Sequence, residues 1–506
     1  MVAVVASLGT VEPVAAQQVW NGGGNNWDST ATNWTNGGLP GIWAGGGALF
    51  NGGPYTVGVA GDQAVTGIEF QTSGYKLLGG ALVLSQNPPV GGGDAVTLVQ
   101  IQSGISAEIG SMLKSGATDS GLGVIGGGTL TLSGMNTYTG LTYIGATTTL
   151  ALAGQGRVNA SSGVEVIGTF DVSAAASAQV KNLTGSGSVL LGNAGLSITA
   201  ANGTFSGTMS GGGLNVSGTK LVLTGANTLT SAGISGGATL QIGDGGTTGS
   251  AGGSLTNYGT VIFNRSDDVT IAGNVTGPGA FAHVGGGKLV LTGNNSGAAT
   301  VLISNGGTLQ FGDDNASGWV ASSSGGTITI DAGSELISKM SNNQRWSGKL
   351  AGAGDFFKQG SGTITLGGDS SAFAGETFVN AGMLNVGYKG IGTLAGPVTV
   401  DAGARFGGSG TVVGNVTIAA GATHRVGDTV PVTPVAGLVQ TQTITGNYVN
   451  HGILEIEATP TTADRLTVNG TVDIANATLN LSLTPNDPSP GRRLGPAQRA
   501  VYDYRQ

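Results

Sequence analysis

Residues 128–140 read GTLTLSGMNTYTG, and this stretch decides the fold. Leu130 and Leu132 alternate with threonines, so a strand here turns its leucines to one side and its threonines to the other. The glycine and asparagine that follow are residue types that tolerate the positive backbone φ angles of a tight turn. Because a strand of this length cannot bury its apolar face alone, several such units have to stack on one another.

The same pattern recurs at three later places in the chain, at 220–228, 288–297 and 362–370. Each later copy is followed by a second short strand that opens from a glycine, at 237–242, 307–311 and 382–386. The four copies share a closing leucine, at Leu132, Leu223, Leu291 and Leu366. The spacing of these leucines predicts turns of about 23–25 residues, with successive copies roughly four, three and three whole turns apart.

These repeats predict an all-β fold, because a helix with a period of 3.6 can be fitted almost nowhere and the frequent glycines would break it. We therefore expect a right-handed, single-stranded parallel β-helix, a pectin-lyase-like solenoid, whose hand follows the general handedness of parallel crossovers. Roughly 20 turns at the ~4.8 Å spacing of strands would make a rod on the order of 100 Å long.

Composition agrees with a glycine-rich solenoid and excludes several other classes of protein. Glycine accounts for 98 of the 506 residues, whereas charged residues make up only 9%. Helical bundles and coiled coils are excluded because they need charged residues and leucine in quantity. The net charge of −8 and the 19 scattered Lys and Arg residues argue against nucleic acid and anionic membranes as partners. Cysteine is absent, which suits an exported and a cytosolic protein alike.

The chain divides into five stretches, which are 1–16, 17–126, 127–439, 440–483 and 484–506. The first is apolar and ends in small residues, as at a signal-peptidase site, but it carries no Lys or Arg. We interpret it as the second half of an export signal, with an ordinary first strand as the alternative. The last stretch carries four arginines and breaks the composition abruptly, which indicates a truncated or frameshifted reading frame or else a basic linker.

The element at 127–140 resembles the passenger-associated transport repeat, also called the autotransporter-associated β-strand repeat, which marks the secreted passengers of Gram-negative autotransporters. The second and third copies keep the leucines, the glycine and the asparagine, whereas they lose the tyrosine. The fourth copy has Phe373-Ala374-Gly375 where the first has Tyr-Thr-Gly. The tryptophan-rich opening at 20–34 is similar to that of many passengers, and 464–481 resembles the stretch just before the translocator.

The resemblance covers about 17–483 and implies a role for each stretch. It implies a Trp-rich N-terminal cap and first coils in 17–126, and the repeat-bearing β-helix in 127–439. It further implies an autochaperone-like cap in 440–483, a region that folds early in the family. It also implies export to the cell surface, the outer membrane or the medium. The family carries a C-terminal translocator β-barrel, and no such strands follow Leu483, so we expect this partner to be missing from the chain.

We predict no catalytic, cofactor-binding or metal-binding residue. The three histidines are His283, His424 and His451. They stand apart without the spacing of metal ligands, so we expect them at the surface or in turns. Ser370 lies in a Gly-Asp-Ser-Ser segment, which lacks the glycine that follows the nucleophile of chymotrypsin-like proteases.

Parallel β-helices also host pectin-degrading enzymes. The positions of the paired carboxylates therefore decide whether an enzymatic function is a real alternative. The adjacent pairs are Asp267-Asp268 and Asp313-Asp314. They would have to meet in one groove to serve as the acid and base of a secreted carbohydrate-active enzyme, a polysaccharide lyase or hydrolase. We expect them instead to be solvated turn residues.

Four of the six tryptophans crowd near the start of the chain, at Trp20, Trp27, Trp34 and Trp43. Exposed indoles would stack on sugar rings and contact a glycan. In the alternative, the four rings cap the first coil, whose apolar end would otherwise meet water.

The sequence therefore predicts a surface-displayed or secreted passenger that acts as a rigid structural or adhesive rod without catalysis. The expected partner is a glycan or protein on a host or neighbouring cell. The enzyme alternative stays open until the positions of the paired carboxylates are known.

Overall fold

The computed structural model describes residues 17–22, 24–85, 95–116, 119–314, 325–427, 440–458 and 462–483. The predicted export signal at 1–16 and the predicted truncated tail at 484–506 lie outside the described residues. Every element in the described part is a β-strand, and in these ranges no helix is long and apolar enough to span a membrane.

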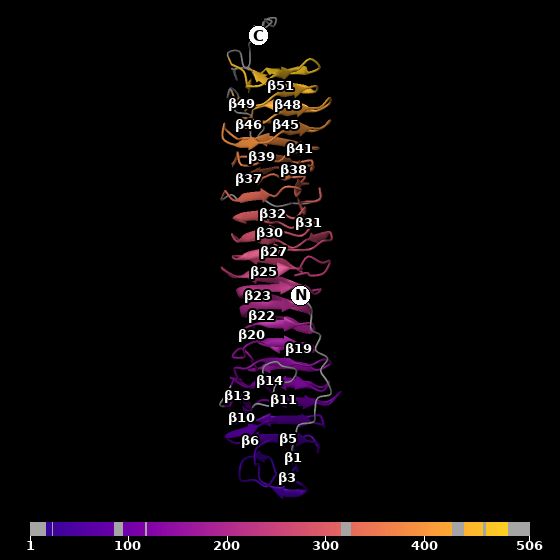
Figure 1. The fold of residues 1–506 in the computed structure, drawn as a ribbon, viewed down its shortest axis with the longest axis vertical. Coiled ribbons are helices and arrows are strands. Elements are labelled where there is room, and N and C mark those ends of the chain that lie inside the picture. The colour runs from indigo at the N-terminus through magenta and orange to yellow at the C-terminus, as the bar shows by residue number, and fades with distance from the viewer. Residues whose placement is uncertain are drawn as a thin grey trace, which may run out of the picture.

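The strands coil into a solenoid of about 20 turns, which confirms the predicted parallel β-helix. Figure 1 shows the rod with β1 (Gln17–Trp20) near one end and β51 (Ile453–Ala458) near the other. Each regular turn carries three short strands, one on each of three faces, and apart from the antiparallel strands at the N-terminal end the strands pair in parallel with strands one turn before or after. At ~4.8 Å per turn the rod is on the order of 100 Å long.

One turn near the N-terminal end shows the arrangement. β14 (Gly121–Ile125) lies on the first face and β15 (Thr129–Leu132) on the second. β13 (Met112–Ser115), which precedes them, lies on the third face with β10 (Ala81–Leu84). The long strand β22 (Ser188–Phe205) runs around the second, third and first faces in succession, so the three faces form one continuous coil.

The predicted length of a turn is wrong. Leu130 pairs with Leu150, and Leu150 pairs with Phe170, so a regular turn takes 20 residues. The closing leucines of the repeat copies also do not lie whole turns apart, because the copies occupy different faces. Those ending at Leu132 and Leu291 lie on the second face, the copy ending at Leu223 lies on the first, and the copy ending at Leu366 lies on the third. The motif describes one strand and the corner after it, and it fits any corner of the coil.

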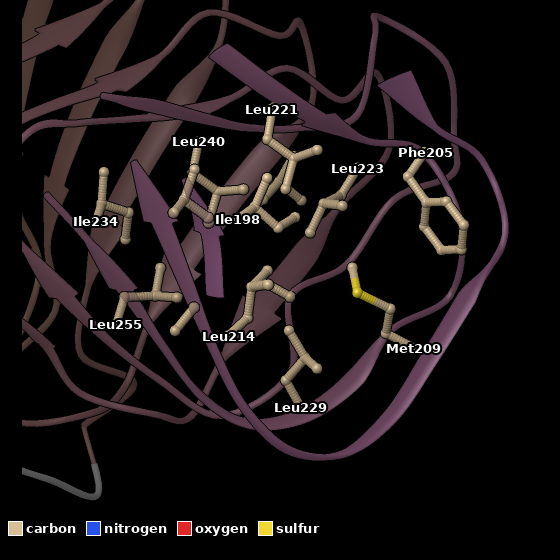
Figure 2. Packing of buried hydrophobic residues seen from close by; sticks show 14 of the residues in the cluster. Ile198, Phe205, Met209, Leu214, Leu221, Leu223, Leu229, Ile234, Leu240 and Leu255 are labelled. Atoms are coloured by element: carbon tan, nitrogen blue, oxygen red, sulfur yellow. The ribbon is translucent and has the colours of Figure 1, made fainter. Parts of the chain in front are cut away.

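Alternation along each strand separates the core from the surface. Leu130 and Leu132 are fully buried, whereas the threonines beside them stay half-buried on the outside. Figure 2 shows the same arrangement farther along the rod, where Ile198, Leu221 and Leu240 point into the interior of the coil. Each buried leucine contributes roughly 1.5–3 kcal/mol by leaving water, which is how short strands become stable once they are stacked.

Glycine is abundant because the corners of the coil stack backbone on backbone. Gly185 has a φ of 107°, and a Cβ there would overlap the carbonyl oxygen of Val166 in the preceding turn. Gly225 has no room for a side chain either, since its Cβ would overlap the carbonyl of Gly207. The glycine content is therefore a consequence of the spacing between turns.

Candidate functional site

The asparagine of the repeat turns inward at a corner of the coil and ties consecutive turns together. Asn136 accepts the backbone N–H of Leu113 at 2.9 Å through Oδ1, and its Nδ2 donates to the carbonyl of Arg157 at 3.1 Å. Asn227 and Asn295 likewise accept a backbone N–H from the turn before them, at 2.8 and 2.7 Å. Because an unpaired buried polar group costs roughly 1–3 kcal/mol, these bonds give the motif's asparagine a structural role.

Ser370 takes the place of this asparagine in the fourth copy. It is buried, and its Oγ accepts the backbone N–H of Leu350 at 2.9 Å. The tyrosine of the first copy is buried as well, since the hydroxyl of Tyr138 lies 2.7 Å from Thr142 Oγ1 and burial raises the pKa of this phenol. Neither hydroxyl faces a surface on which a substrate could bind.

The expectation of surface histidines is wrong for two of the three. His283 and His424 are buried on the inward side of their strands, while His451 is exposed. Burial lowers the pKa of both, to about 4 for His424. His424 lies 2.7 Å from Tyr448 Oη through Nδ1 and 2.7 Å from Gln442 Oε1 through Nε2, so each ring nitrogen has a partner. Within the described ranges no three His, Asp or Glu side chains gather to hold a metal ion.

The paired carboxylates do not converge. Asp267 lies at the corner between β27 (Thr260–Phe263) on the first face and β28 (Val269–Ile271) on the second. It forms an ion pair with Arg265 at 2.6 Å, and the hydrogen bond from that guanidinium lowers the pKa of the carboxyl. Asp268 accepts the backbone N–H of Lys288 at 3.0 Å. Asp267 is therefore engaged with an arginine of its own corner, and Asp268 with the backbone of the next turn.

The second pair lies at a different corner and farther along the rod. Asp313 and Asp314 follow β33 (Thr308–Phe311) on the second face, and Asp314 lies 3.8 Å from Lys339 Nζ. The pairing of Val261 with Phe281 and of Phe281 with Val301 places this corner two turns beyond the first pair. The arrangement does not favour the carbohydrate-active enzyme, which needs its carboxylates in one groove.

The four N-terminal tryptophans pack against one another inside the first turns. Trp27 and Trp34 are fully buried, and the exposed fractions of Trp20 and Trp43 are 2% and 6%. Ring centroids lie 4.5–5.2 Å apart between Trp34 and the other three, mostly edge to face. Their indole N–H groups have no hydrogen-bond partner in the described part, which suits edge-to-face contacts that aim N–H groups at aromatic rings. Rings buried in this way offer no face to a sugar.

A small hairpin on the side of the rod escaped the sequence analysis. It joins β42 (Met383–Val386) on the third face to β43 (Thr393–Ala395) on the first. Tyr388 and Ile391 face each other across it, and Lys389 and Gly390 form its tip with φ angles of 54° and 76°. The centre of the Arg345 guanidinium lies 4.4 Å from the centroid of the Tyr388 ring, and Lys389 Nζ lies 5.3 Å from it. The signal available in the sequence was the Lys-Gly pair between two short apolar runs, but Lys-Gly is not the Asn-Gly pair typical of such turns.

Comparison with known families identifies the repeat. A family model described as the passenger-associated-transport-repeat matches residues 124–152, 284–311 and 356–386. Each matched stretch contains two strands that pair in parallel on the same face. Thr129 pairs with Thr149 in the first match, and Lys288 pairs with Thr308 in the second. A matched stretch is therefore one full turn of the solenoid together with the strand that begins the next turn on the same face.

Comparison with curated proteins points the same way. The adhesin BmaC autotransporter of Brucella suis biovar 1 (strain 1330) is 30% identical to the chain over 171 residues. The matched region is 31% of this chain and 5% of the relative, so the chain spans a small part of that protein's length. No solved structure matches the chain.

Proposed function

Because the chain is an autotransporter passenger domain built on passenger-associated transport repeats, we propose that it is a rigid, non-catalytic adhesive rod. Proteins of this family are exported, and we propose that this chain is displayed at the cell surface or released from it. Its partner would be a glycan or protein of a host or neighbouring cell. The observation that carries the proposal is the long solenoid with the family's repeat at its corners.

The physical basis is the way in which the solenoid is held together. Hydrogen bonds between turns run along the rod, and the interior turns of the described part bury their inward leucines against neighbouring turns, whereas Leu479 and Leu481 of the last described turn are exposed. A rod on the order of 100 Å built in this way carries groups on its surface well away from its base. Its outward residues could change without disturbing the core, because they do not pack in the interior of the coil, and this suits a recognition surface.

Folding after export follows from the same geometry. Contacts join residues about one turn apart, so folding can start at one end and advance turn by turn. We propose 440–483 as the starting point and the Trp cluster (Trp20, Trp27, Trp34 and Trp43) as the cap at the opposite end. The buried bonds of His424 with Tyr448 and Gln442 support the first assignment, because they tie the turns next to this stretch together.

Adhesion is tested with the purified full chain, fluorescently labelled and incubated with cultured animal cells and with unrelated bacteria. Saturable binding that unlabelled chain displaces is the expected result. A thermally unfolded sample of the same chain is the matched control, because its composition is identical and only the rod is lost. Absence of displaceable binding to every cell type would overturn the adhesive proposal.

A further inference from the structure

A second short motif recurs along the chain, separate from the passenger repeat. The triplet Asn-x-Ser/Thr, with a residue other than proline in the middle, begins at 13 of the 32 asparagines. Ser and Thr make up 99 of the 506 residues, so composition alone would place such a hydroxyl after only about one asparagine in five. In exported proteins this triplet is the acceptor signal for N-linked sugars.

The structure places most of these asparagines on the outside of the rod. Asn315 lies outside the described residues, and of the twelve within them eight are exposed, three are half-buried and one is buried. The buried one is Asn33, directly before Trp34, and its Nδ2 donates to the carbonyl of Asn26 at 2.8 Å. A sugar on Asn33 would not fit there, so this triplet serves as an internal negative reference.

Two of the exposed asparagines, Asn274 and Asn415, lie at corners of the coil, each directly before a strand. In each, Oδ1 accepts the backbone N–H of an asparagine one turn later, that of Asn294 at 2.8 Å and that of Asn447 at 2.9 Å. Within the described ranges no group accepts a hydrogen bond from Nδ2 of Asn274 or Asn415. The bond through Oδ1 therefore fixes the amide and leaves Nδ2, the atom that carries an N-linked sugar, open at the surface.

The hydroxyl of each triplet lies on the same side of the strand as its asparagine. Because side chains alternate along a strand, the middle residue, Val275 or Val416, points into the core and is buried. Thr276 and Thr417 consequently face outward, and Thr417 is exposed. An enzyme that approaches this side of the rod meets the amide and the hydroxyl together.

The solenoid does not itself require this hydroxyl. Asn343 and Asn447 are exposed corner asparagines of the same kind, since Oδ1 of each accepts a backbone N–H from the next turn at 2.9 and 3.0 Å. Two residues further along the chain they are followed by Arg345 and Val449. The bond between turns therefore forms without the triplet, and the triplet needs another explanation where it occurs.

We propose that Asn274 and Asn415 are sites of N-linked glycosylation. The donor is a sugar activated at C1 as a diphosphate ester, and a transferase of the producing cell catalyses the step. The bond from C1 to the phosphate oxygen breaks and a bond from C1 to Nδ2 forms, while the diphosphate leaves with the electron pair and Nδ2 gives up one proton to a base of the transferase. The bond between turns uses Oδ1, so it survives the modification. The inference does not rest on the proposed adhesive function.

The test is peptide mapping by mass spectrometry of the full chain isolated from the bacterium that encodes it. Fragmentation by electron transfer keeps a sugar on the residue that carries it. Sugar is expected on Asn274 and Asn415, and none on Asn33, Asn343 or Asn447. A single hexose at each site would indicate a nucleotide-activated donor, and a preassembled oligosaccharide would indicate a lipid-linked one.

Three variants made in the same bacterium separate the triplet from its place in the fold. Thr276→Val and Thr417→Val remove the hydroxyl but keep the asparagine with its bond, so each should abolish the sugar at its own site and leave the other site occupied. Val449→Thr completes the triplet at Asn447 and should add a sugar there. Thermal unfolding of each variant shows that the rod is intact.

Each contrary result overturns the assignment. A native chain without sugar on any asparagine would exclude N-linked glycosylation, and sugar found on serine or threonine instead would assign the modification to hydroxyl groups. Sugar that persists on Asn274 in Thr276→Val would show that the triplet is not what the enzyme recognises. None of these outcomes bears on adhesion, which the cell-binding experiment measures separately.

Discussion

Two hairpins of this rod share a two-residue tip with positive φ angles, but one lies at the N-terminal end and the other on the side. The first joins β3 (Trp34–Asn36) to β4 (Leu39–Gly41) at the N-terminal end, with Gly37 and Gly38 at its tip at φ angles of 60° and 89°. The second is the side hairpin at Tyr388–Ile391. In each, the residue that follows the turn is highly exposed, at 73% for Leu39 and 68% for Ile391.

The two hairpins differ in the direction of their aromatic residue. Trp34 is fully buried among the other three N-terminal tryptophans, whereas Tyr388 lies half-buried at the surface beside two cations. An inward aromatic ring adds to the core, and an outward one holds a charged group in position. The same turn therefore places an aromatic residue in the core at one position and at the surface at the other, and the difference is open to measurement.

The largest effect is expected from Trp34→Ala. Removing a buried indole from a packed cluster should lower the free energy of unfolding by about 3–5 kcal/mol. The loss should be confined to the first turns, because each turn of a solenoid contacts only its neighbours. Hydrogen exchange of β5 (Gly47–Phe50) and β6 (Thr56–Val59) measures it, and unchanged protection there would mean that the indoles do not close the end of the rod.

Lowering the pH should destabilise the polar interior around His424 while it leaves the stability of the N-terminal Trp cluster unchanged. His424 has a pKa of about 4 in the folded chain, because burial disfavours its charged form, against about 6.5 when unfolded. The unfolded state therefore takes up the proton first. His424 should leave stability unchanged above about pH 6.5 and should lower it progressively down to pH 4, by up to roughly 3 kcal/mol.

Hydrogen exchange of β50 (Tyr448–Asn450) as a function of pH follows this loss, with the amides around Trp34 as the internal reference. His424→Gln removes the titrating group and should flatten the dependence. Asp464, whose pKa burial raises, acts in the opposite direction and is present in both proteins. A parent and variant with the same pH dependence would exclude His424 as its source.

Much of this structure follows from short patterns in the sequence, and the rest depends on contacts between turns. Alternation at Leu130 and Leu132 predicts strands that must stack, and the solenoid confirms it. The period was misjudged because the motif was assumed to recur on one face, whereas a strand and its corner fit all three. The contact of Arg345 with Tyr388 crosses two turns, so it becomes visible only when the 20-residue register is known. Buried histidines were missed for a similar reason, since Phe263, His283 and Ile303 stack in register on one ladder and all point inward, which only the pairing between turns reveals.

A matched pair of glycines tests whether the two turns are equivalent. Gly38 and Gly390 both have positive φ, and an added Cβ at either would have no atom within 4 Å. Alanine at each position should therefore cost the backbone strain alone, roughly 1–2 kcal/mol. For Gly38→Ala we expect a lower unfolding temperature and faster exchange in the first turns. For Gly390→Ala we expect faster exchange only at the hairpin. Equal effects on the whole rod would show that the side hairpin also supports the fold.

The smallest effect on stability, and the sharpest test of the comparison, comes from Tyr388. An exposed cation–π contact is worth roughly 0.5–1 kcal/mol, so Tyr388→Ala should lower the free energy of unfolding by denaturant by no more than about 1 kcal/mol. Tyr388→Phe keeps the ring beneath the Arg345 guanidinium and should be as stable as the parent. If Tyr388→Ala were as destabilising as Trp34→Ala, the direction of the aromatic ring would not distinguish the two hairpins, since both would then be parts of the core.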